Sequence, residues 1–370
     1  MTSILYVGMD VHTTNYTLCC YDIATDKIFA TVTVEPDYKN IVKYLGKVER
    51  EQGGDCYFLC GYEAGSLGYS LYHQLIGQEV DCVILAPTTM AAPRKKGIKT
   101  DKRDASNIAK CLAYNTYSPV YVPTGEDNAV KEYIRMRNDA KDMIKKLKQQ
   151  TLAFCTRHGK RFTDGRNYWT QKHMAWLQKL DFRNPVLNET LQEYLVLYHQ
   201  TVGKVELYDK RIAEFADTEM YREKVKRLTC FIGIKEHTAL AAIVETGDFK
   251  RFPTARHYAS YLGLVPGEDS SGTSVQRTGI TKAGNSHIRK LLVEAAQCYS
   301  RGAIGTKSKA LKQRQSGNEP KVIAYADRAN ERLKRKCYRI MFNSKHNIAV
   351  TAVARELACF VWGMMTDNVA

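Results

Sequence analysis

The sequence predicts an α/β domain at the N-terminus, followed by a long helical segment and a mainly helical C-terminal domain. Two observations carry this prediction. Residues 4–122 alternate short, apolar, β-rich runs with helical patterns, which is typical of α/β domains. From residue 125 onward, apolar positions recur at helical spacing between charged faces, which indicates amphipathic helices. We therefore expect three segments, 1–124, 125–228 and 229–370.

The N-terminal elements follow one another in a specific order. Three β-rich runs come first, a helix follows, and strands and helices then alternate. We expect strands at 4–12, 16–23, 27–35, 57–63 and 81–87, and helices at 38–51, 66–78 and from 101 onward. The order β-β-β-α-β-α-β-α is that of the RuvC-like and ribonuclease-H-like folds, in which helices cover a mixed sheet.

Four acidic residues stand at the ends of these elements. Asp10 lies in the first strand, and Glu63 closes the fourth. Asp101 and Asp104 begin the last helix three residues apart, so they share one face. Four negative charges in one cleft repel each other unless cations neutralise them, and Mg²⁺ takes hard oxygen ligands and binds phosphate as well. The acids therefore predict a Mg²⁺ site and phosphoryl transfer on a nucleic acid.

The overall charge favours the same class of partner. The chain has 370 residues and a formal net charge of +16, which suggests a polyanionic partner, although a merely soluble basic protein is the alternative. Residues 301–345 hold thirteen Lys and Arg against three Asp and Glu. The densest run contains Lys334, Arg335 and Lys336, and we expect these side chains to bind nucleic acid rather than to form a solvated helix face.

Other classes of protein are disfavoured. No apolar run of membrane-spanning length and no secretory signal is apparent, so we expect a cytoplasmic, nucleoid-associated protein without a membrane partner. Eleven cysteines without a CxxC pair indicate reduced thiols and argue against a structural zinc site.

The middle segment predicts a long helical hairpin or coiled coil. Such a hairpin can bridge domains, mediate dimerisation or bind nucleic acid. Residues 131–161 are rich in Lys and Arg, with Tyr133, Phe154 and His158 interleaved, which mildly favours nucleic-acid binding. A solvated helix face is an equally good interpretation.

The C-terminal segment opens with a turn, Gly233-Ile234-Lys235, before a helix of small residues. This pattern resembles a helix-hairpin-helix, whose backbone amides contact phosphate, although an ordinary helical hairpin also explains it. The stretch from Gly267 to Asn285 is dense in Gly, Ser and Thr and is expected to be a loop between helices. Long loops held between rigid elements often carry function.

Six motifs then follow one another along the chain: GMDVH, GYEAG, KTDKRDA, FIGIKEHTALAAIVETGDFKRF, YLGLVPGEDSSGTSVQRTGITKAGNSHIRKLLVEAA and VARELACFVW. In this order they resemble the IS110 family of bacterial insertion-sequence transposases, also known as bridge-RNA-guided recombinases. In that family a RuvC-like DEDD domain precedes a serine-bearing transposase domain. The resemblance covers nearly the whole chain.

The resemblance implies specific roles for residues of both domains. Asp10, Glu63, Asp101 and Asp104 would form the metal-binding tetrad. The nucleophile would be the serine that precedes a glycine after LGLVP, which here is Ser271.

Two other serines near Ser271 are further candidates for the nucleophile. Ser270 is adjacent to Ser271, and Ser274 is a remote third candidate, because Gly272-Thr273-Ser274 stands where many members have Gly-Gly-Lys. Serine attack on DNA gives a covalent phosphoserine link and needs an activated hydroxyl. Cations close in sequence can stabilise the developing charge, and these are Arg277, Lys282, His287 and Arg289.

The resemblance also implies partners. The DNA of the element ends and of the target would be the substrate, and a noncoding guide RNA would select both by base pairing. The protein would act as a homo-oligomer, a dimer or tetramer. The metal domain and the serine domain would form one composite active centre, within one subunit or between two.

Two other functions fit the same residues. A hydrolytic nuclease of the Holliday-junction type would use the tetrad and water, and it would leave no covalent adduct. A nucleic-acid-binding scaffold with a degenerate nuclease domain is the non-enzymatic alternative, which the intact acids disfavour. A phosphotransferase of the actin-like class is disfavoured because the chain has no Gly-rich phosphate loop.

Overall fold

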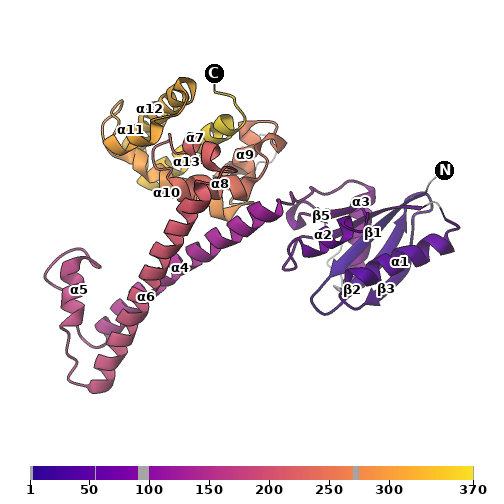
Figure 1. Ribbon diagram of the computed structural model, residues 1–370, viewed down its shortest axis with the longest axis horizontal. Helices are drawn as coiled ribbons and strands as arrows, with labels where there is room; N and C mark the ends of the chain where they lie inside the picture. Colours follow the sequence, from indigo (N-terminus) through magenta and orange to yellow (C-terminus); the bar gives the residue numbers. More distant parts are fainter. Residues whose placement is uncertain (1–2, 55, 91–99, 270–273, 275, 370) are drawn as a thin grey trace. The chain divides into compact units, whose positions relative to one another are not determined.

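The computed structural model describes residues 3–54, 56–90, 100–269, 274 and 276–369. It divides into two compact units, Met1–Val122 and Pro123–Ala370 (Figure 1). The helical segment that follows residue 124 therefore lies in the same unit as the C-terminal helices.

The N-terminal unit is built on a five-stranded mixed sheet with the strand order β3-β2-β1-β4-β5. β1 pairs antiparallel with β2, and β2 with β3, whereas β1 with β4 and β4 with β5 are parallel. The strands β1 to β5 span Ser3–Val11, Tyr16–Asp22, Lys27–Val34, Cys56–Glu63 and Cys82–Leu85. This topology confirms the expected α/β fold of the RuvC and ribonuclease-H type.

Alternation along β1 divides its side chains between two helical layers. Val7 and Met9 are buried in a core that includes α1 and α2, whereas Tyr6 packs with residues of α3 on the other face. Because side chains alternate along a strand, Gly8 and Asp10 fall on the face that α3 covers. The helices α1 to α3 span Tyr38–Glu51, Ser70–Ile76 and Asp101–Ala113.

The second unit begins with two long helices, α4 (Gly125–Arg157) and α6 (Pro185–Ala216), which pack against each other (Figure 1). The guanidinium of Arg137 in α4 donates two hydrogen bonds to the carboxylate of Asp209 in α6, at 2.7 and 2.9 Å. The short helix α5 (Gln171–Gln178) lies in the segment that joins them. The predicted helical hairpin is therefore present.

The aromatic side chains of the basic stretch 131–161 pack inside this hairpin. Tyr133 makes ring contacts with Tyr208 and Phe215 of α6. Phe154 is buried in a cluster with residues of α5 and α6. Helix packing therefore accounts for the positions of Tyr133 and Phe154.

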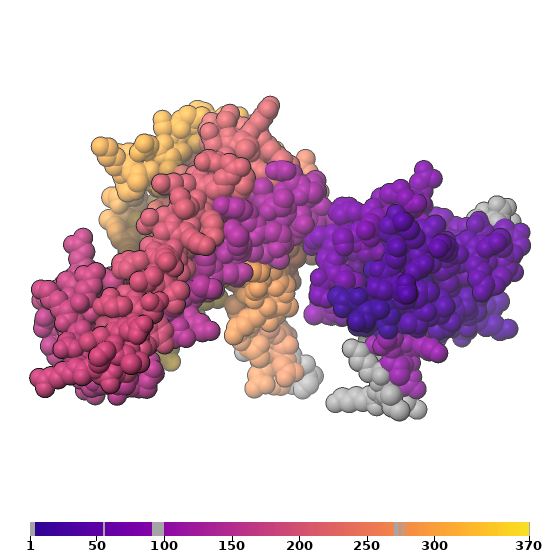
Figure 2. Space-filling model, turned by 60° about the horizontal axis from the view of Figure 1, so that its bottom comes forward, coloured from indigo at the N-terminus to yellow at the C-terminus, as the bar shows by residue number. Residues whose placement is uncertain are grey.

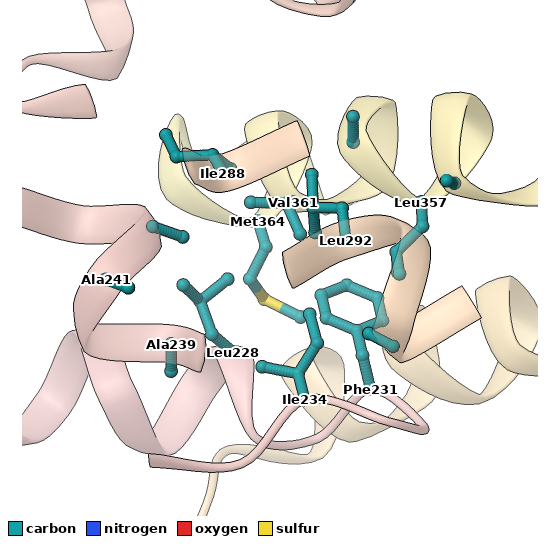
Figure 3. Close-up of a cluster of buried hydrophobic side chains, with 14 of the residues drawn as sticks. Leu228, Phe231, Ile234, Ala239, Ala241, Ile288, Leu292, Leu357, Val361 and Met364 are labelled. Carbon is teal, nitrogen blue, oxygen red and sulfur yellow. The ribbon is translucent and has the colours of Figure 1, made fainter. Parts of the chain in front are cut away.

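Seven further α-helices complete the second unit within the described residues. All of them except α11 contribute to one core, in which Phe231 and Ile234 precede α8, Leu292 comes from α10, and Leu357 from α13 (Figure 3). The helices α7 to α13 span Arg222–Leu228, Glu236–Thr246, Ala255–Tyr261, Ser286–Ala296, Lys309–Gln315, Pro320–Asn343 and His346–Met365.

Helix α13 is long and apolar enough to span a membrane by length and composition alone. Half of its most apolar stretch is buried in the protein. Val353, Leu357 and Val361 are completely buried in the core of the second unit. Its apolar sequence is therefore explained by packing against α9, α10 and α12.

The stretch from Gly267 to Asn285 is not entirely a loop. Two short antiparallel strands, β6 (Pro266–Glu268) and β7 (Arg277–Ile280), pair within it. The hairpin projects from the surface of its unit (Figure 2). The high Gly, Ser and Thr content of this stretch favoured a loop in the sequence analysis. The two strands are also too short to leave a clear periodic signal in the sequence.

Candidate metal centre and serine hairpin

Gly8 allows helix α3 to approach strand β1 closely. A β-carbon at Gly8 would lie 1.9 Å from the backbone oxygen of Ala105 and 2.5 Å from the backbone nitrogen of Ala109. Any side chain there would therefore displace the helix. Since α3 begins at Asp101, this contact brings the first turn of α3 beside the end of β1 that carries Asp10.

Three side chains converge at this point. One ligand atom each from Asp10, His12 and Asp101 lies within 4.8 Å of the other two. The His12 Nε2 atom is 3.4 Å from the Asp10 Oδ2 atom. Carboxylate oxygens and an imidazole nitrogen are suitable donors for a divalent cation.

The electrostatics of Asp10 fit such a cation. Burial raises the pKa of the Asp10 carboxyl, His12 lowers it, and the charges of Asp101 and Asp104 raise it further, so that the pKa lies above its usual range. The Asp10 Oδ2 atom is buried and has no hydrogen-bond partner among the described residues. A bound cation would supply the missing partner and neutralise the repulsion.

Of the remaining predicted acids, Glu63 lies at the same end of the sheet as Asp10, and Asp104 lies in the first turn of α3. Glu63 ends β4 and is exposed. Met9 and Tyr62 are paired in parallel register, so Asp10 and Glu63 occupy the next positions on neighbouring strands. Glu63 stands outside the cluster of three, and Asp104 acts on Asp10 through its charge.

His12 is the one member of the cluster that the sequence reasoning missed. It comes two residues after Asp10, and residues two apart in a strand point to the same side. That spacing is the signal that could have identified it.

In the sequence, the predicted serines fall between β6 and β7. Ser270 and Ser271 lie outside the described residues. Ser274 is described and exposed. Arg277 is the first residue of β7, and Lys282 follows that strand with a left-handed backbone, φ +56°.

A buried carboxylate anchors the chain after this hairpin. Glu245 of α8 is 8% exposed. It accepts two hydrogen bonds from the Arg135 guanidinium, at 2.8 and 2.9 Å, and one from Asn285 Nδ2 at 2.8 Å. Burial alone would raise the pKa of Glu245, but these hydrogen bonds lower it below its usual range. Asn285 also caps α10 through the backbone N–H groups of His287 and Ile288.

A groove of about 1280 Å³ lies between α4 and the N-terminal ends of α8 and α10. Three of the predicted phosphate-stabilising residues, Lys282, His287 and Arg289, line it. Arg289 also donates a 2.8 Å hydrogen bond to the backbone oxygen of Leu262. Burial, followed by the charge of Arg137, lowers the pKa of His237 in this groove to about 4, so its imidazole is neutral at pH 7.

The predicted basic run on α12 divides between surface and interior. The Lys334 side chain is 6% exposed, and its ammonium donates to the backbone oxygens of Gly302 and Ala303 at 3.4 and 2.9 Å. Lys334 therefore holds a loop and does not offer a surface charge. Arg335 is largely exposed, and Lys336 is about one-quarter exposed.

Two family models match these two regions. The model described as "Transposase IS116/IS110/IS902 family" matches residues 225–313, which include the serine hairpin and α10. A DEDD-type IS110 model described as "Transposase" matches residues 7–158, which include the acidic cluster.

Curated relatives extend over most of the chain. "Putative transposase y4qE" of Sinorhizobium fredii is 34% identical over 354 residues, covering 91% of this chain and 86% of the relative. "Transposase for insertion sequence element IS1533" of Leptospira borgpetersenii is 31% identical over 339 residues, covering 90% and 95%. "Insertion element IS110 uncharacterized 43.6 kDa protein" of Streptomyces coelicolor is 33% identical over 142 residues, covering 38% and 28%. The chain belongs to the IS110 family of insertion-sequence transposases.

Proposed function

We propose that this transposase cuts and rejoins DNA through a covalent serine–DNA intermediate, with Mg²⁺ held by the acidic cluster and with a noncoding RNA as guide. The observation that carries the proposal is the convergence of Asp10, His12 and Asp101 around a buried carboxylate oxygen without a hydrogen-bond partner. A nucleic-acid enzyme whose acids meet in this way needs a divalent cation at that place.

The metal site would draw its ligands from Asp10, Asp101, Asp104 and Glu63, with His12 as an additional donor. When bound, Mg²⁺ would neutralise phosphate charge and polarise a phosphoryl oxygen. The protein itself contributes the alignment, because Gly8 sets the distance between β1 and α3. Asp10 contributes a preformed buried oxygen.

Ser271 is the proposed nucleophile. Its Oγ atom attacks a backbone phosphorus, forms an O–P bond and passes its proton to a base, while the P–O bond to one sugar breaks and that sugar oxygen takes up a proton. Rejoining reverses these steps with a different DNA end, so the bond energy is conserved. The groove beside α10 is the proposed path of the attacked strand, since Lys282, His287 and Arg289 line it and can stabilise the developing charge.

The partners follow from the same assignment. The net charge of +16 suits a protein that contacts phosphate backbones and leaves sequence selection to RNA base pairing. We further propose that the protein works as a homo-oligomer on chromosomal DNA, in the cytoplasm at the nucleoid.

Trapping of the adduct tests this proposal. The full chain is incubated with its guide RNA and a nicked suicide DNA substrate, then denatured, and the modified peptide is identified by mass spectrometry. We expect DNA on Ser271, no adduct in Ser271→Ala, and an unchanged yield in Ser274→Ala. An adduct on Ser270 moves the assignment by one residue, and metal-dependent cleavage without any adduct would instead establish a hydrolytic nuclease.

A further inference from the structure

The second unit carries a basic surface that is separate from the groove beside α10. Two adjoining grooves form it, of about 620 and 550 Å³. They share Arg332, Lys336 and Glu356. We name this surface, built by α12 with the neighbouring parts of α9 and α13, the arginine surface.

The cations of α12 recur on one helix face. Arg328, Arg332, Arg335 and Arg339 are spaced by three or four residues, which places them in a row along the helix. The row extends about 16 Å, at 1.5 Å per residue. Arg256 of α9 and Arg355 of α13 widen it on the side of the second groove.

Glu356 orders the centre of the arginine surface. Its side chain is 14% exposed and accepts hydrogen bonds from Lys336 at 2.6 Å and from Arg332. Burial alone would raise the pKa of Glu356, but these two cations lower it, so the carboxylate stays ionised and fixes both side chains. Side chains that are already ordered lose less entropy when they bind a ligand.

The arginine surface keeps an excess of positive charge. Seven cationic side chains line the two grooves, and the two carboxylates there are Glu331 and Glu356. Glu331 pairs with Arg335. Among the described residues, no ion pair involves Arg256, Arg339 or Arg355.

We propose that the arginine surface anchors the phosphodiester backbone of nucleic acid away from the site of chemistry. Arginine forks bind phosphate oxygens in a bidentate manner, and a row of them suits a polymer with repeated charges. A protein partner usually needs an apolar centre in the interface. Here Phe360 packs against the core instead.

This role differs from the one proposed for the groove beside α10. The two grooves of the arginine surface share no lining residue with the groove beside α10. The inference rests on the proposed function only in taking nucleic acid as the partner. It predicts that binding and chemistry can be separated by substitution.

The test compares two triple variants of the full chain that remove the same charge. Arg328→Gln with Arg335→Gln and Arg339→Gln alters the arginine surface, whereas Lys204→Gln with Lys210→Gln and Lys224→Gln removes three exposed cations elsewhere in the unit. A third variant replaces the same three arginines by Lys. Affinity is measured against salt concentration with a 30-base-pair DNA duplex and with an RNA duplex of the same sequence.

We expect the log–log salt slope of the Arg→Gln triple variant to fall by about 2 to 3, since each phosphate contact contributes about 0.9 on duplex DNA. The Arg→Lys variant keeps the slope because it keeps the charge. If the salt slope falls with only one of the two duplexes, that duplex, DNA or RNA, is the one that the arginine surface binds. The proposal would be overturned if the Arg→Gln variant and the control variant with Lys204, Lys210 and Lys224 replaced by Gln had equal salt slopes with both duplexes. It would also be overturned if the salt slope of the Arg→Lys variant were as low as that of the Arg→Gln variant.

Adduct formation on saturating suicide DNA separates this inference from the proposed function. The Arg→Gln variant should form the Ser271 adduct at the wild-type rate once DNA saturates it. Absence of the adduct in the wild-type protein would overturn the serine mechanism and leave the salt-slope comparison intact. A slower adduct in the Arg→Gln variant at saturation would contradict the separation of binding from chemistry.

Discussion

At the scale of single residues, Asp10 is a proposed metal ligand whose carboxylate is unfavourable to bury in its ionised form. Its raised pKa, caused by burial and by the charges of Asp101 and Asp104, means that the ionised carboxylate is unfavourable in the metal-free fold. Asp10→Asn should therefore stabilise the metal-free protein and abolish its stabilisation by Mg²⁺. For the wild type, that stabilisation is about 2.7 kcal/mol when the ion exceeds its Kd a hundredfold.

Thermal unfolding with and without MgCl₂ measures both effects. Glu49→Gln, an exposed change on α1 of the same unit, is the matched control and should keep the full Mg²⁺ effect. A Tm rise in Asp10→Asn equal to that of the wild type would remove Asp10 from the metal site.

Glu245 should make the stability of the fold depend on pH. Its folded-state pKa lies below the ordinary value of 4.5, so its ionised form stabilises the fold above that pH, and the stabilisation is lost as pH falls through the folded pKa. Glu245→Gln should cost roughly 2 kcal/mol at pH 7, reduced because Arg135 is partly exposed. It should also flatten the acid side of the stability profile. Urea unfolding from pH 3 to 7 checks this, with exposed Glu236→Gln on the same helix as the control that keeps the wild-type profile.

At the scale of elements, the contact between β1 and α3 decides whether the acids meet. Gly8→Ala places a β-carbon 1.9 Å from the Ala105 oxygen, so α3 must move, at a cost of about 1–3 kcal/mol. The stabilisation of the protein by Mg²⁺ should weaken as well, because the displaced helix carries Asp101. Gly46→Ala is the matched control, because nothing lies within 4 Å of its β-carbon in α1, and it should stabilise the helix by about 0.5–1 kcal/mol.

Denaturant unfolding of the two glycine variants, monitored with and without MgCl₂, gives the comparison. A Gly8→Ala protein with wild-type stability and metal response would show that α3 adapts without moving Asp101, and the proposed role of Gly8 would be lost.

At the scale of the whole molecule, the chain consists of two units with separate cores. A unit with its own core can fold alone. We expect fragments 1–122 and 123–370 each to unfold cooperatively, with the Mg²⁺-induced rise in Tm in fragment 1–122 only. Calorimetry of both fragments measures this. A fragment 1–122 without a cooperative transition would show that its core depends on the rest of the chain.

The order of strands and helices in the N-terminal unit, and the positions of the four acids within it, could be predicted from the sequence because strand and helix periodicities are local patterns. The resemblance to the IS110 family could also be recognised from the sequence motifs, and the comparison with relatives then showed it. The sequence did not reveal His12 as a partner of Asp10, nor the β6–β7 pairing, because these depend on contacts that periodicity does not encode.

The availability of charged residues for binding depends on how distant segments pack together. Lys334, Arg335 and Lys336 are consecutive, yet Lys334 is buried against a loop that lies more than thirty residues earlier. Glu245 looks like any helical glutamate until Arg135 and Asn285, which lie 110 and 40 residues away, meet it. Composition indicates how much charge a segment holds. Packing between distant segments decides which charges are paired inside and which remain at the surface.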